Sequence, residues 1–132
     1  MRLWSLALIM WVGCAGSEQS SLETFFLFGK AESIRVDADG AWFFVRLVPD
    51  QNQVGRPTYL TSCQLVNISC QFQINQVLEG VYDAYGLIDL NGNTDRFDPQ
   101  GDRNDLVAPP KPLLMLSRQQ LDFGDEVWLR YP

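Results

Sequence analysis

The sequence predicts an all-β fold: a single domain built as an antiparallel two-sheet sandwich of about seven strands. Short apolar runs alternate with turn-forming Gly, Pro, Asp and Asn residues, and no stretch keeps a helical period. The alternation is clearest at 70–75, where Cys70, Phe72 and Ile74 fall on one face. An apolar content of 46% with 12% aromatic residues is ordinary for a folded domain. We place this domain at residues 22–132.

The expected strands follow from where these runs begin and end. Asp37-Ala38-Asp39-Gly40 contains an Asp-Gly pair suited to a tight turn, so the runs on either side of it are expected to form a hairpin. Pro109-Pro110-Lys111-Pro112 is expected to break the chain, because proline removes a ladder donor. The expected strands are 22–28 (ending at Gly29), 33–36, 41–48, 58–61, 70–75, 81–88, 113–116 and 126–131.

Large aromatic side chains are expected to fill the space between the two sheets. In the last strand, alternation is expected to turn Val127, Leu129 and Tyr131 inward. The expected aromatic core is Trp42, Phe43, Phe44, Phe72, Tyr85 and Trp128.

The first residues have the pattern of an export signal. Arg2 supplies a positive charge, Leu3 to Val12 form an apolar stretch, and the small residues of Gly13-Cys14-Ala15-Gly16 suit a processing peptidase. About ten apolar residues span only about half of a bilayer core, so this stretch is not a transmembrane helix. We assign residues 1–13 to a signal peptide.

Val12-Gly13-Cys14 resembles the lipobox of bacterial lipoproteins. The resemblance implies that Cys14 is lipidated and begins the mature protein, with residues 14–21 as lipidated cysteine and polar tether, so the membrane is a partner through the lipid anchor. Ala15 resembles the pattern of lipoproteins sent to the bacterial outer membrane. Because Trp11 stands where the motif usually has an aliphatic residue, the alternative is an ordinary secretory leader cut after Ala15 or Gly16, which gives a freely secreted protein.

Cys63 and Cys70 lie close together in the sequence of an exported chain. An oxidising compartment favours a disulfide between them. A metal-binding pair is the competing interpretation, although the chain has no histidine. Lipidation of Cys14 would account for the odd number of cysteines.

The segment from Asp89 to Asp105 is the richest polar stretch. Its oxygen-bearing side chains at alternate positions can converge where a strand turns back, and calcium prefers six to eight such ligands. It is not an EF-hand, because glycine stands at the fourth position and Gln100 at the twelfth. The alternative is an Asx-rich turn whose side chains bind their own backbone. The candidate calcium ligands are Asp89, Asn91, Asn93, Asp95, Asp98 and Asp102.

The same stretch resembles bacterial transthyretin-like or carboxypeptidase-regulatory-like sandwich modules. The matching residues are Gly80-Val-Tyr82, Asp89-Leu-Asn91-Gly92-Asn93, Asp95, Asp98 and Gly101-Asp102. The match covers residues 71–106, and Thr94 departs from the commoner second glycine of the loop. The resemblance implies a loop that orders a strand connection and in some members holds calcium.

Charge and composition narrow the function classes. A net charge of −6 at pH 7 argues against nucleic acid as a partner. Without histidine, hydrolysis would require paired carboxylates or a Ser-Lys pair, and no motif supports either, so we expect no enzyme.

We expect a membrane-anchored envelope lipoprotein that acts as a protein-binding or assembly module through its acidic loop and exposed strand edges. The alternative is a freely secreted β-sandwich that binds a small ligand or glycan through exposed aromatic residues.

Overall fold

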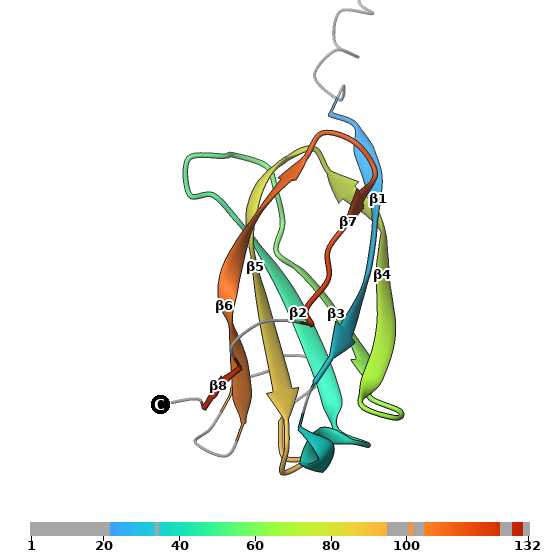
Figure 1. The fold of residues 1–132 in the computed structure, drawn as a ribbon. Helices are drawn as coiled ribbons and strands as arrows, with labels where there is room; N and C mark the ends of the chain where they lie inside the picture. The colour runs from blue at the N-terminus through green and yellow to red at the C-terminus, as the bar shows by residue number, and fades with distance from the viewer. Residues whose placement is uncertain (1–21, 34, 95–100, 102–104, 125–127, 131–132) are drawn as a thin grey trace, which may run out of the picture.

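The structure, a computed structural model, describes residues 22–33, 35–94, 101, 105–124 and 128–130. The predicted two-sheet sandwich is confirmed, with two β-sheets stacked face to face (Figure 1). The elements are β1 (Thr24–Glu32), the 3₁₀ helix η2 (Val36–Ala38), β2 (Trp42–Pro49), β3 (Tyr59–Gln64), β4 (Ser69–Leu78), β5 (Gly80–Asp89), β6 (Leu106–Met115), β7 (Gln119–Gln120) and β8 (Leu129–Arg130).

One sheet has the strand order β4-β1-β7 and the other β3-β2-β5-β6-β8. All pairs but one are antiparallel, as predicted; β7 runs parallel to β1, with Leu27 opposite Gln119. The parallel pair arises because the chain leaves β6 in the larger sheet and returns on the far side of β1. The connection continues the pairing beyond β7, where the Phe123 N–H donates to the Lys30 carbonyl at 2.8 Å.

The core lies between the sheets and is rich in aromatic rings. The rings of Phe43 and Phe123 are 5.3 Å apart, and those of Phe43 and Phe72 are 5.9 Å apart. Cys70 and Ile74 pack against this core from the same face of β4 as Phe72, which confirms the predicted alternation. Trp128 also packs on Phe43, whereas Leu129 is half exposed, so the predicted inward face of the last strand is wrong by one residue. Val127 and Tyr131 lie outside the described residues.

Tyr82, and not Tyr85, is the buried tyrosine of β5. Tyr85 is 42% exposed, while Tyr82 is fully buried and its hydroxyl donates to the Leu78 carbonyl at 2.7 Å. Burial raises the pKa of Tyr82 to about 12. Gly86 lies on the inward face with Tyr82, where an added Cβ would come within 3.0 Å of the ring of Phe123. A side chain at position 86 would therefore require the core ring to shift.

The predicted hairpin around Asp37–Gly40 is wrong. The turn exists, with Gly40 at a φ of 85°, but it carries the chain from β1 in one sheet to β2 in the other. The Gly40 N–H donates to the Leu65 carbonyl at 2.8 Å and so ties this crossing to the β3–β4 turn. An Asp-Gly pair favours a turn locally but does not select the partner of the following strand.

The predicted break at residues 109–112 is also wrong, because β6 runs through all three prolines. Ala108 pairs with Gly86 and Lys111 with Ala84, so Pro109 and Pro110 together face one residue of β5 in a β-bulge. β8 pairs only with the beginning of β6, at Leu106 and Val107. Proline is tolerated at bulges and on edge positions, where no ladder donor is needed.

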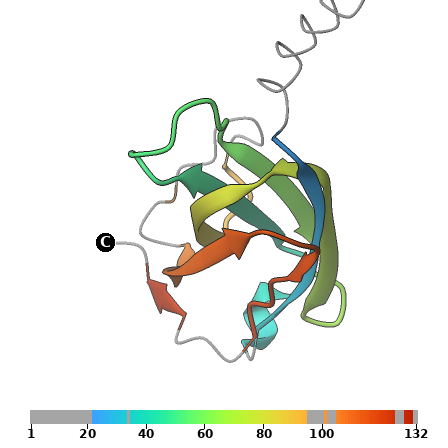
Figure 2. The same cartoon turned by 90° about the horizontal axis from the view of Figure 1, so that it is seen from above.

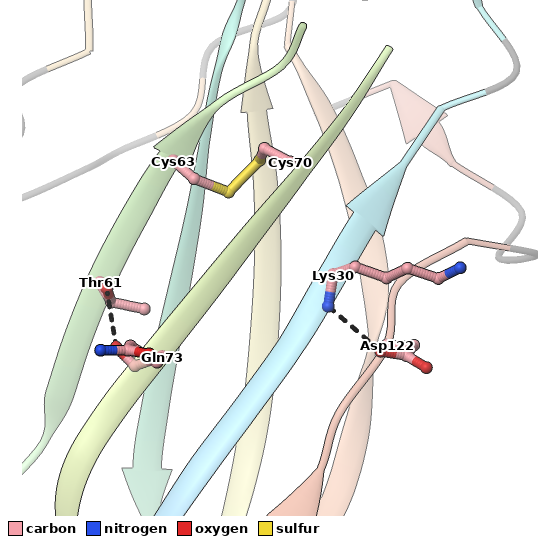
Figure 3. The surroundings of a disulfide bond; sticks show 6 residues. All are labelled: Lys30, Thr61, Cys63, Cys70, Gln73 and Asp122. Carbon is pink, nitrogen blue, oxygen red and sulfur yellow. Dashed lines mark hydrogen bonds between the residues drawn. A yellow bond between two sulfur atoms is a disulfide. The ribbon is translucent and has the colours of Figure 1, made fainter. Parts of the chain in front are cut away.

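The predicted disulfide between Cys63 and Cys70 is confirmed, with a Cα–Cα distance of 5.9 Å (Figure 3). It joins β3, at the edge of the larger sheet, to β4, at the edge of the smaller one. Below it the Thr61 hydroxyl donates to the Gln73 carbonyl at 3.5 Å. The bridge therefore closes one side of the sandwich across the two sheets.

Replacing Cys63 with alanine is expected to lower the free energy of unfolding by about 2 kcal/mol, because a short closed loop gains the least from a cross-link. The melting temperature should fall by roughly 8 °C or somewhat more, at about 4 °C per kcal/mol for a domain of this size. Thermal unfolding of wild type and Cys63→Ala checks this. Thiols that react with an alkylating agent before reduction would contradict the disulfide.

The strands run between two opposite ends of the molecule (Figures 1 and 2). At the tether pole the chain enters β1, and the turns at 50–58, 79 and 116–118 join the strands. At the acidic pole lie the connections at 33–41 and 65–68 and the segment that follows β5. Across the described ranges, no helix has the length and apolarity needed to cross a membrane.

Candidate functional surfaces

The acidic pole contains a hollow with a cavity volume of about 350 Å³. Three carboxylates and an indole contribute to it, from the η2 turn, the start of β2 and the end of β5. The lining residues are Asp37, Asp39, Gly40, Ala41, Trp42, Asp89, Leu90, Asn91 and Gly92. The predicted ligands Asp89 and Asn91 therefore lie at this pole, together with two acids that were expected only to form a turn.

Asp89 holds the beginning of the acidic segment through its own backbone. One carboxylate oxygen accepts the N–H of Gly92 at 3.1 Å, the other accepts the N–H of Thr94 at 3.0 Å, and the residue is only 3% exposed. The Asn91 side-chain oxygen accepts the N–H of Asn93 at a longer 3.4 Å. These contacts have the pattern of the Asx-rich turn that the sequence offers as the alternative to calcium.

Asp105 is a residue of this site that the sequence analysis did not single out. It is completely buried, and its carboxylate accepts the N–H of Leu90 at 3.1 Å. Asp89 and Asp105 thus stabilise the two ends of the segment, next to the paired residues Ile88 and Leu106. The signal available in the sequence was that Asp105 stands immediately before an apolar run. An acid at that position lies where a loop enters a strand.

The other carboxylates of the hollow are also engaged. Arg35 donates two hydrogen bonds to Asp37, at 3.0 and 2.5 Å, and this guanidinium holds the pKa of Asp37 below its usual range. Asp39 accepts the N–H of Ile68 at 3.2 Å. Among the described residues, no three acids, cysteines or histidines come together as a metal-binding group.

Calcium binding stays a prediction, because half of its proposed ligands fall outside the described residues: Asp95, Asp98 and Asp102. Cys14, the predicted lipidation site, falls outside them as well.

A second candidate surface, the aromatic groove, crosses the outer face of the three-stranded sheet. Phe26 and Phe28 project outward from β1 with their rings stacked 5.7 Å apart. The Arg118 guanidinium lies over both rings, 5.3 Å from the centre of Phe26 and 4.9 Å from that of Phe28. The groove is open, with a cavity volume of about 640 Å³.

Polar side chains from three strands flank these rings. Gln73 lies opposite Phe28 on β4, and Gln120 lies opposite it on β7. Asp122 closes one end: its carboxylate accepts the backbone N–H of Lys30 at 3.1 Å (Figure 3) and the Gln120 amide at 2.9 Å. The full lining is Phe26, Phe28, Gly29, Lys30, Thr61, Ser62, Gln71, Phe72, Gln73, Arg118, Gln120 and Asp122.

The third surface is the outer face of the five-stranded sheet, where polar residues are expected but apolar ones are found. Tyr85 is 42% exposed, and the directly paired Val81 and Leu114 are 38% and 51% exposed. Val48 and Pro112 lie beside them on either side of Asp83. We call Val48, Val81, Tyr85, Pro112 and Leu114 the apolar face.

No protein-family model matches the chain, and comparisons with curated proteins and with solved structures likewise found no match.

Proposed function

We propose that the chain is a lipoprotein of the bacterial outer membrane, anchored through Cys14, whose sandwich is a protein-binding or assembly module and not a catalyst. The observation that carries the binding role is the apolar face. Val81 and Leu114 are paired, Tyr85 lies beyond Asp83 on the same face of β5, and all three are more than a third exposed. Exposed apolar side chains on one face of a sheet favour a protein interface, because burying them removes apolar surface from water.

The strand edges are less suited to a partner than the sequence suggests. The disulfide joins the edges of β3 and β4, and three prolines interrupt the donors of β6. Pairing with a further strand needs a row of free N–H and C=O groups, which prolines disrupt. We therefore assign the contact to the apolar face, with the acidic pole as a second region that attracts basic groups.

Anchoring is tested by the mass and location of the mature protein. The intact mass is expected to exceed that of residues 14–132 by several acyl groups. Cys14→Ser should release the protein from the membrane fraction or leave it unprocessed, because several acyl chains are needed for stable anchoring. A mature N-terminus at Ala15 or later would refute the anchor.

Partner binding is tested with a photo-cross-linking amino acid at Tyr85 in cells that produce the full chain. A discrete adduct is expected from Tyr85 and none from Asn75, an exposed position of β4 outside both the apolar face and the aromatic groove. Leu114→Glu should abolish the Tyr85 adduct without changing the melting temperature, since Leu114 is half exposed. An adduct that persists in Leu114→Glu would contradict binding at the apolar face.

The second candidate is a freely secreted sandwich that binds a small ligand or glycan. The aromatic groove favours it, because Phe26 and Phe28 present ring surface beside several side-chain amides. A mature protein that lacks Cys14 and is recovered from the soluble fraction would favour this candidate over the first.

A further inference from the structure

We propose that the aromatic groove binds an acidic saccharide, a chain of sugar rings that carry carboxylates, and that Arg118 binds the carboxylate. This inference deepens the second candidate function by naming its ligand class. It does not depend on how the protein is anchored.

Arg118 is the first reason. Its guanidinium makes no hydrogen bond or ion pair with the described part of the chain, although the protein has 16 acidic residues for 10 basic ones. It lies instead over Phe26 and Phe28, whose ring faces attract a cation. This contact does not use the N–H donors of the guanidinium in hydrogen bonds, and a guanidinium edge matches a carboxylate in a two-point hydrogen bond.

The amide side chains are the second reason. Gln71 and Gln73 lie side by side on the outer face of β4, and their amide groups make no hydrogen bond to the described residues. Gln120 donates to Asp122, which leaves its side-chain carbonyl as an acceptor. Each amide offers donors and an acceptor, the combination that suits neighbouring hydroxyl groups.

The position of the groove favours a saccharide over an acidic peptide. It lies on the face of a sheet, where β1 already uses its backbone groups to pair with β4 and β7. A peptide would find no backbone partners there, and strand addition requires a free edge. A sugar chain needs none, since its hydroxyl groups meet the amides, its C–H surfaces meet the rings and its carboxylate meets Arg118.

The test compares two probes that differ only in charge, oligomers of galacturonic acid and their methyl esters, by calorimetric titration of the full-length protein in detergent. The acid is expected to bind about ten- to one-hundredfold more tightly than the ester, the difference that one charge-assisted hydrogen-bonded pair gives. Arg118→Gln should remove that difference and leave a residual affinity common to both probes. Phe28→Ala should weaken both probes together.

Arg35→Gln is the control, because it also removes an arginine that is partly exposed, but Arg35 is paired with Asp37 and lies at the acidic pole. It should leave both affinities unchanged. Equal binding of acid and ester, or an unchanged preference in Arg118→Gln, would overturn the proposal. Displacement of the acid by an oligoglutamate peptide at equal concentration would overturn the saccharide assignment. Each result is independent of the Cys14 mass and of the Tyr85 adduct, which test the proposed function.

Discussion

Gly29→Ala is expected to lower the melting temperature by about 12 °C, from a loss of about 3 kcal/mol at about 4 °C per kcal/mol. An alanine Cβ at this position would lie 1.7 Å from the Leu121 carbonyl oxygen and 2.8 Å from the ring of Phe72. The carbonyl cannot simply move, because the Leu121 N–H donates to the Phe28 carbonyl at 2.9 Å. The segment after β7 must therefore separate from β1.

Gly124→Ala is the control, since its added Cβ would come no closer than 3.9 Å to the Glu32 side chain. Thermal unfolding should show at most a small change there. If Gly29→Ala had the same melting temperature as Gly124→Ala, this result would contradict the close approach of Leu121 to β1. Because Gly29 also lines the aromatic groove, the same variant should lose the floor of that surface.

Asp89→Ala is expected to cost about 3 kcal/mol of unfolding free energy when measured in chelator. The substitution removes both acceptors that hold the N–H groups of Gly92 and Thr94, and hydrogen bonds to a charged group contribute about 1.5–3 kcal/mol each. Part of the loss is recovered because the freed loop takes up water. Equal melting temperatures of wild type and Asp89→Ala in chelator would contradict the conclusion that Asp89 stabilises this turn.

The effect of calcium on the melting temperatures of wild type and Asp89→Ala is a separate test. If Asp89 and the predicted ligands after it hold the ion, millimolar calcium should raise the melting temperature of the wild type by mass action and leave Asp89→Ala unchanged. Asp83→Ala, which removes an equal charge from the exposed face of β5, should keep the wild-type response. Identical wild-type curves in chelator and in calcium would exclude a site.

The sequence predicted the fold class, the disulfide and the alternation of β4 because these depend on local pattern and compartment. It failed at Gly29 and at Pro109 and Pro110, which are strong local signals for a break. In the structure both lie inside strands and are explained by contacts with other parts of the chain. Gly29 allows Leu121 to approach β1, and Pro109 and Pro110 occupy a bulge opposite Tyr85. No single-strand pattern contains that information.

The aromatic groove was beyond prediction for a similar reason. Alternation places Phe26 and Phe28 on one face of β1 and Leu27, Gly29 and Ala31 on the other, and hydrophobicity alone would favour burying the face with two rings. The sandwich buries the small residues instead, because the neighbouring segment lies close against them. Arg118 then reaches the rings from the far end of the sequence, and only the parallel pairing of β1 with β7 brings it there.

If the chain is anchored at Cys14, the two poles lie at different distances along the strands from the residue where the chain enters β1. β5 has 10 residues, so at about 3.3 Å per residue the acidic pole would be about 33 Å farther from the lipid than the tether pole. That distance exceeds the Debye length of about 8 Å at physiological salt, so the charge of the lipid headgroups would neither attract nor repel Asp37, Asp39 and Asp89. The apolar face and the aromatic groove lie on the outer faces of the two sheets, so in a molecule anchored at Cys14 both would be open to molecules that diffuse along the membrane.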